Sequence, residues 1–206
     1  AGSNCLHEAV ALAAHAASSG AAGVAAVAPS YFKPASVELL VDCCAQVPAA
    51  APELPFYYYE IPSLTGLNLP MPEFLERAAD RIPNLAGLKY SHTDLVAFQR
   101  CREASGGRFE VFWGTDEVLL GALALGARAA VGSTYNFAAP IYHSLLAAFA
   151  AGDWKRARRD QLRSVTLVGI LDRRSFMASA KTLMRMLGVE VGPARLPHRN
   201  LTPVEQ

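Results

Sequence analysis

The sequence is short of charge of either sign and has no long hydrophobic run. Charged residues occupy 18% of its 206 positions and the net charge is +1, which favours neither a nucleic acid nor an anionic membrane as partner. No stretch approaches the roughly 18 apolar residues of a membrane-spanning helix. The first apolar stretch lacks the basic segment that precedes a signal sequence. We therefore expect no membrane and no nucleic-acid partner.

The cysteines and histidines are few and show no metal-binding spacing. Cys43 and Cys44 are adjacent in a helical pattern, which is more typical of small buried side chains than of a redox pair. The five histidines are scattered and form no ligand pair at helical spacing. The sequence thus predicts a reduced, cytoplasmic, metal-free protein.

What the sequence does contain is a regular alternation of short apolar segments and helical patterns. Hydrophobic residues make up 52% of the chain, which is enough for a sizeable core. The alternation predicts parallel βα units with short connections. The predicted strands are residues 23–28, 55–61, 86–91, 108–113 and 129–133. The predicted helices cover about residues 5–19, 36–47, 72–82, 94–104, 116–125, 139–150, 153–171 and 175–187.

Two parallel architectures fit this order, an open doubly wound sheet and a closed (β/α)₈ barrel. No Gly-rich phosphate loop follows a strand, which argues against a dinucleotide-binding sheet. Polar residues stand at the predicted carboxyl ends of the strands, where barrel enzymes keep their chemistry. We predict an α/β fold of the TIM-barrel type, here an incomplete barrel of about five βα units plus C-terminal helices. Residues 1–206 are interpreted as a single partial domain, with barrel units over 1–138 and the last barrel helix and a helical extension over 139–206.

Lysine is the scarcest charged residue, and one lysine lies in an unusual place. Only Lys33, Lys89, Lys155 and Lys181 occur, and of these only Lys89 falls in a predicted buried strand. A desolvated lysine loses its proton more easily than an exposed one, and a neutral amine attacks carbonyl groups to form a Schiff base. The alternative is a lysine paired with a carboxylate at a sheet edge.

Four ordered motifs carry a family resemblance that covers nearly the whole chain. They are Tyr57-Tyr58-Tyr59-Glu60-Ile61-Pro62-Ser63-Leu64-Thr65-Gly66, Gly87-Leu88-Lys89, Gly114-Thr115-Asp116-Glu117 and Gly132-Ser133-Thr134-Tyr135-Asn136. Their order and spacing resemble the pyruvate-dependent aldolase family, which includes dihydrodipicolinate synthases and N-acetylneuraminate lyases. Leu64 stands where the synthases carry an arginine that holds a dicarboxylic product, and Leu64 cannot form that carboxylate pair. The run from Gly114 to Glu117 resembles the sialic acid lyase branch.

The resemblance implies a reaction and a role for each motif. Lys89 would form the Schiff base with the substrate, and Tyr59 would transfer the proton. The substrate pocket and the sugar would be contacted by Ser91, Gly114, Asp116, Glu117 and Ser133. The reaction would be aldol cleavage of N-acetylneuraminate to N-acetylmannosamine and pyruvate. It would need no cofactor beyond the covalent imine, and the family implies a homotetramer.

Each of these residues also has a structural interpretation. Asp116 and Glu117 stand in the first turn of a predicted helix, where acidic side chains complement the helix dipole. Tyr59 belongs to an aromatic run of the kind that packs in cores. Ser133 is placed to cap the following turn. The motifs taken together favour the functional interpretation.

The resemblance also implies that a front part of the barrel is missing. The family has about eight barrel strands, and only the last five are recognisable here. The loop whose hydroxyls and amides grip the substrate carboxylate would lie in the missing part. Two alternatives therefore stay open, another pyruvate-dependent aldolase of the same family and a catalytically silent short form.

Overall fold

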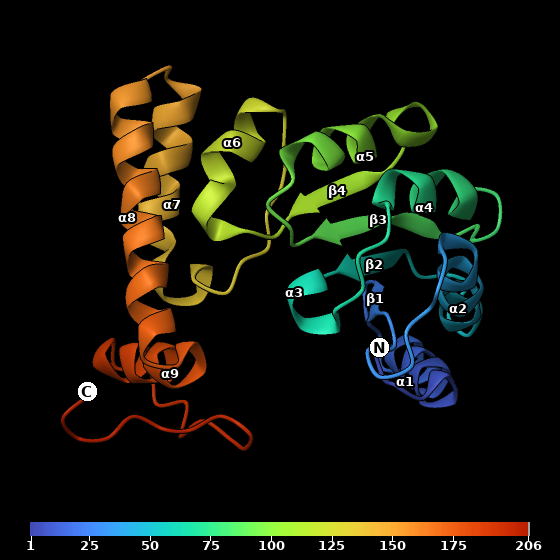
Figure 1. Cartoon of the computed structure of the whole chain (residues 1–206), viewed down its shortest axis with the longest axis horizontal. Coiled ribbons are helices and arrows are strands. Elements are labelled where there is room, and N and C mark those ends of the chain that lie inside the picture. Colours follow the sequence, from blue (N-terminus) through green and yellow to red (C-terminus); the bar gives the residue numbers. More distant parts are fainter. Residues whose placement is uncertain (206) are drawn as a thin grey trace. The chain divides into compact units, whose positions relative to one another are not determined.

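One parallel sheet organises the first half of the chain. The computed structural model describes residues 1–205. Strands β1 (Val24–Val27), β2 (Phe56–Glu60), β3 (Leu85–Tyr90) and β4 (Glu110–Trp113) pair in the order β1-β2-β3-β4, and all pairs are parallel (Figure 1). Each strand leads through helical structure to the next, so the predicted βα alternation is confirmed.

The predicted strand at 129–133 is wrong, because it shrinks to a single bridge between Trp113 and Ala130. The Trp113 amide donates to Ala129 O at 3.0 Å, and the Val131 amide donates to Trp113 O at 2.9 Å. Beyond that point the backbone of Gly132 packs against the side chain of Asp116, so closely that a Cβ would lie 1.7 Å from Asp116 Oδ1. The segment therefore leaves the sheet after one pairing.

Helices fill the connections between the strands and the whole of the C-terminal part. Their bounds are α1 Leu6–Ser18, α2 Val37–Ala49, α3 Pro62–Thr65, α4 Met71–Ala78, α5 Leu95–Gly107, α6 Leu119–Ala124, α7 Tyr135–Ala150, α8 Trp154–Arg173 and α9 Phe176–Met186. Helices α1, α2, α4 and α5 pack on one another in that order beside the sheet (Figure 1). The predicted Ser36 cap is confirmed, since its side chain accepts a hydrogen bond from the Leu39 amide at 3.2 Å.

Three helices differ from what the sequence predicts. The predicted helix at 116–125 begins as a 3₁₀ turn, Asp116–Val118, before α6. The short helix α3, which begins at Pro62, was not predicted, although proline suits a first helical turn. Helix α7 starts at Tyr135 rather than 139, because it continues across a kink at Ala138, two residues before Pro140.

The sheet has two faces of different character. Phe56, Tyr58, Leu88 and Trp113 are buried and form part of the core. Tyr57 and Tyr59 in β2 and Lys89 in β3 point to the opposite face because side chains alternate along a strand. This second face carries the predicted catalytic pair.

The chain divides into two compact units. One comprises residues 1–115 and 121–131, and the other comprises residues 116–120 and 132–205. The single-domain interpretation of residues 1–206, with its boundary at 138 and 139, remains a prediction. In the second unit α7 packs along α8, and α9 packs on α8 (Figure 1). Among residues 1–205 we find no helix of the length and hydrophobicity needed to span a membrane.

Candidate active site

Lys89 and Tyr59 lie side by side in the first unit. They are register partners on the neighbouring strands β3 and β2. The Lys89 Nζ stands over the Tyr59 ring, 4.0 Å from its centroid. Both side chains are half-buried. The predicted nucleophile and the predicted proton-transfer residue are therefore in contact with each other.

Aromatic and polar side chains flank this pair on the same sheet face. Phe112 on β4 is the register partner of Lys89 on its other side. In the next layer Tyr57 donates a hydrogen bond to the Glu110 carboxylate, and burial and this carboxylate raise the pKa of Tyr57 to about 12. Gly87 stands between them, where a Cβ would meet Glu110 O at 1.8 Å. Only glycine fits there.

Ser91 and Gly114 meet just beyond the carboxyl ends of β3 and β4. The Ser91 amide donates to Glu60 O at 3.0 Å, and the Gly114 amide donates to Tyr90 O at 2.8 Å. A Cβ on Gly114 would lie 2.1 Å from Ser91 Oγ, so Gly114 has a packing reason to be glycine. Ser91 Oγ itself is buried and has no hydrogen-bond partner within residues 1–205. This hydroxyl is therefore an unsatisfied polar group enclosed between the ends of two strands.

Asp116, in the second unit, is largely committed to the fold. It is 6% exposed, and its Oδ2 accepts from the Thr134 amide at 3.1 Å and from Thr134 Oγ1 at 2.5 Å. Its Oδ1 is buried without a partner in the described chain. One oxygen therefore holds the turn before α7, while the carboxylate also faces Tyr135, whose pKa is raised by burial and by Asp116.

Glu117 and Ser133 are more accessible. Glu117 is half-buried, and desolvation raises the pKa of its carboxyl above the usual range. Ser133 is exposed; its carbonyl accepts from Asn136 Nδ2 at 2.9 Å, and its hydroxyl makes no hydrogen bond within residues 1–205. The predicted capping by the Ser133 hydroxyl is therefore not seen.

A buried polar network behind Asp116 was missed by sequence reasoning. Thr134 Oγ1 is hydrogen-bonded to Tyr142 Oη, which is 2.8 Å from Ser164 Oγ. Ser164 Oγ also donates to Asp116 O at 3.2 Å. Burial raises the pKa of Tyr142. The hydrogen-bonded partners are 8 to 48 residues apart in sequence, so no local sequence pattern predicts these contacts.

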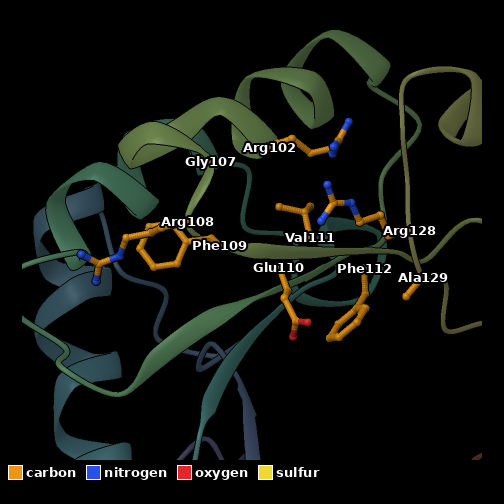
Figure 2. A pocket seen from close by; sticks show the side chains of 9 residues that line it. All are labelled: Arg102, Gly107, Arg108, Phe109, Glu110, Val111, Phe112, Arg128 and Ala129. Atoms are coloured by element: carbon orange, nitrogen blue, oxygen red, sulfur yellow. The ribbon is translucent and has the colours of Figure 1, made fainter.

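A separate cavity of about 200 Å³ lies at the amino-terminal end of β4 (Figure 2). Its lining includes Arg102, Arg128 and Val111, and none of the predicted site residues. Barrel enzymes keep their chemistry at the opposite, carboxyl end of the strands. Within residues 1–205 there is no group of three histidine, cysteine, aspartate or glutamate side chains that fits a metal ion.

The site joins an amine and a phenol on neighbouring strands of a parallel α/β sheet. A lysine amine in such a position can bind a carbonyl compound as an imine. The chain belongs to the Dihydrodipicolinate synthetase family, whose profile matches residues 1–206. The predicted α/β fold of the TIM-barrel class is confirmed by the solved structures that resemble it.

The similar proteins are lyases and synthases of this family. The chain is 42% identical to the N-acetylneuraminate lyase of Rattus norvegicus over 200 residues, which is 96% of this chain, and 40% identical to that of Homo sapiens over 199 residues, which is 95%. It matches the structure of the N-acetylneuraminate lyase, or sialic acid aldolase, of Aliivibrio salmonicida with a TM-score of 0.95 at 41% identity, over 99% of this chain and 68% of that one.

A synthase structure is also similar. The dihydrodipicolinate synthase of Cyanidioschyzon merolae, solved with lysine bound, matches with a TM-score of 0.89 at 32% identity, over 100% of this chain and 68% of that one. The chain spans 62% of the length of the rat and human lyases.

Proposed function

We propose that the protein cleaves N-acetylneuraminate to N-acetylmannosamine and pyruvate. The observation that carries the proposal is the contact between Lys89 and Tyr59, 4.0 Å from Nζ to ring centroid, in a chain 42% identical to a sialic acid lyase. A strand-borne lysine beside a phenol supplies a nucleophile and a proton carrier on one rigid support.

The proposed reaction begins at the keto carbon of the open-chain sugar acid. The neutral amine of Lys89 attacks this carbon, and loss of water leaves an imine. Tyr59 donates its proton to the departing water and becomes a phenolate. The protonated imine accepts electrons, so the bond between the third and fourth carbons breaks while the proton of the hydroxyl on the fourth carbon passes to the Tyr59 phenolate through the substrate carboxylate. N-acetylmannosamine leaves, Tyr59 returns this proton to the third carbon of the enamine, and water hydrolyses the protonated imine to pyruvate and free lysine, with the released proton going back to Tyr59.

The remaining motifs give the proposed specificity. Ser91 Oγ, buried and without a partner in the described residues, would contact the substrate. Glu117 and Ser133, with Asp116, would accept and donate hydrogen bonds to the hydroxyl-rich tail of the sugar. Leu64 is 78% exposed and offers no charge to a second carboxylate. This set suits a polyhydroxylated substrate better than a dicarboxylic one.

The proposal is tested by trapping the imine. Residues 1–206 are incubated with pyruvate and borohydride, which reduces the imine to a stable secondary amine on the lysine. Peptide mass spectrometry should find one three-carbon adduct, on Lys89. Lys89→Arg should abolish the adduct, whereas the control Lys155→Arg should retain it. An adduct on another lysine contradicts the assignment, and no adduct on a cooperatively melting protein favours the silent form.

A different sugar acid is the second candidate substrate. The observation that keeps it open is that Asp116 is buried and engaged by Thr134, so fewer contacts select the sugar than the motif alone suggests. Turnover of N-acetylneuraminate is compared with that of related 2-keto sugar acids. A higher specificity constant for one of these would replace the proposed substrate.

The assembly and the location are further parts of the proposal. We infer a cytoplasmic homotetramer from the family. Exposed apolar side chains on α8, with Leu162 63% and Ile170 41% accessible, support an assembly that covers them. Light scattering of the purified protein would measure a mass of about four chains, and a monomer across the micromolar range would contradict the inference.

A further inference from the structure

Glu60 is a buried carboxyl that the proposed reaction does not use. It directly follows Tyr59, but its side chain projects from the core face of β2, as do those of Phe56 and Tyr58. It is 4% exposed, and its Oε2 has no hydrogen-bond partner among residues 1–205. Burying a carboxyl without a hydrogen-bond partner costs on the order of several kcal/mol of folding free energy. Such a group therefore requires an explanation.

Glu60 lines a cavity of about 310 Å³ inside the first unit. The cavity lies between the ends of β2 and β3, the start of α4 and the first turns of α5. Its apolar wall is formed by Leu69, Pro70 and Met71. This volume is at the lower end of the range that accommodates small organic ligands.

Several other polar groups of the cavity are engaged with one another, and Asn68 and the exposed Arg100 also line it. Tyr90 Oη donates to Asp94 O at 3.2 Å, and His92 Nδ1 accepts from the Asp94 amide at 2.9 Å. Asp94 Oδ1 accepts from the amides of Val96 and Ala97, both at 2.9 Å, as the cap of α5. None of these groups reaches Glu60 Oε2. An acceptor is therefore presented to the cavity with apolar surface beside it.

We propose that this cavity binds a small organic cation, a primary ammonium group with an apolar body. The ammonium would donate to Glu60 Oε2, and the apolar body would lie against Leu69, Pro70 and Met71. A buried carboxylate beside an apolar wall favours this class, because the charge pair forms at an oxygen shielded from bulk water while the body gains burial. The site is distinct from the Lys89 face and does not depend on the proposed reaction.

The charges around Glu60 set how binding depends on pH. Burial raises the pKa of Glu60 to about 7. The titratable and charged groups that surround it or line the cavity are Tyr58, Tyr90, His92, Asp94, Arg100 and Cys101. Binding of an ammonium requires the carboxylate, so the apparent affinity follows the ionised fraction. That fraction rises about tenfold between pH 6 and pH 8 for a pKa of 7, and the affinity should rise with it.

The experiment measures binding of benzylammonium chloride to residues 1–206 by isothermal titration calorimetry at pH 8 and constant ionic strength. We expect a dissociation constant on the order of 1 mM, and at least tenfold weaker binding of benzyl alcohol and of benzoate. At pH 6 the benzylammonium affinity should be about tenfold lower. Binding should also shift the methyl resonance of Met71.

Two matched variants decide whether Glu60 is the partner. Glu60→Gln keeps the shape of the neutral side chain and should lose at least tenfold in benzylammonium affinity. Glu103→Gln makes the same chemical change on α5, outside the cavity, and should bind as the parent does. The proposal is overturned if the parent binds no benzylammonium up to 20 times the expected constant (about 20 mM), if benzyl alcohol or benzoate binds equally well, or if Glu60→Gln binds unchanged.

Discussion

The ammonium of Lys89 lies over the face of the Tyr59 ring, 4.0 Å from its centroid. The two residues are register partners on adjacent parallel strands, so the backbone fixes the contact. A ring face attracts a cation, so the contact holds the Lys89 side chain over Tyr59. In the proposed reaction Tyr59 therefore has two functions, because its ring contacts Lys89 and its hydroxyl exchanges a proton with the substrate.

Tyr59→Phe should separate these two functions. The ring and its contact with Lys89 are kept, while the phenol proton is lost. We expect pyruvate trapping by borohydride within a few-fold of the parent, and cleavage of N-acetylneuraminate lowered by about 10²- to 10⁴-fold, as when a general acid–base group is removed. Equal losses of trapping and turnover would mean that the hydroxyl acts mainly before carbon–carbon cleavage.

Asp116 and Glu117 should respond differently to substitution, although the sequence motif treats them alike. Asp116→Asn disturbs the oxygen that accepts from the Thr134 amide and hydroxyl, so it should lower the free energy of unfolding by about 1–3 kcal/mol. Glu117→Gln removes only charge from a half-buried side chain. Its melting temperature should stay within 2 °C or so, while the specificity constant for the sugar falls roughly 10- to 150-fold.

Denaturant unfolding and steady-state kinetics on the same preparations check this contrast. A stable Asp116→Asn protein with a selective kinetic defect would show that Asp116 acts mainly on substrate. A Glu117→Gln protein with parental kinetics would remove Glu117 from the sugar site.

Gly114→Ala should destabilise the protein because of its contact with Ser91. The added Cβ would lie 2.1 Å from Ser91 Oγ, and overpacking of this kind costs about 1–3 kcal/mol. Gly169→Ala is the matched control, since Gly169 lies within α8 and a Cβ there meets nothing within 4 Å. That control should gain up to about 1 kcal/mol from helix propensity. Chemical denaturation measures both, and an unchanged Gly114→Ala midpoint would mean that Ser91 moves freely.

Much of the first unit could be predicted from local pattern. Alternation along the aromatic strand and the position of Lys89 in the next strand are enough to put Tyr59 and Lys89 on one face, because parallel strands in register align their side chains. The same alternation places Glu60 with Phe56 and Tyr58, so its burial was predictable in principle. Glu60 was not among the predicted site residues because the motif gives it no catalytic role.

The second unit shows where sequence reasoning stops. The commitment of Asp116 to Thr134 joins residues 18 positions apart, and Tyr142 and Ser164 complete the network from two further helices. Periodicity predicts which face of a helix is buried but not which hydroxyl meets which carboxylate. The lost fifth strand has a similar cause, since Gly132 leaves the sheet to pack on the Asp116 side chain.

The stability of the protein should depend on pH through Glu60. Burial raises the pKa of Glu60 from 4.5 to about 7, so between these values the folded protein binds a proton that the unfolded chain has lost. Stability must then fall as pH rises through this window, by about 3 kcal/mol at most for a shift of this size.

Glu60→Gln carries no titrating carboxyl and should lack this decline. The variant should therefore match the parent near pH 5 and unfold at higher denaturant concentration near pH 8, whereas Glu103→Gln, with an exposed carboxyl removed, should follow the parent throughout. Urea unfolding midpoints of the three proteins at pH 5, 6, 7 and 8 make the comparison. A parent and a Glu60→Gln variant with parallel pH profiles would show that Glu60 is ionised in the folded protein across this range and that a group of the fold stabilises its charge.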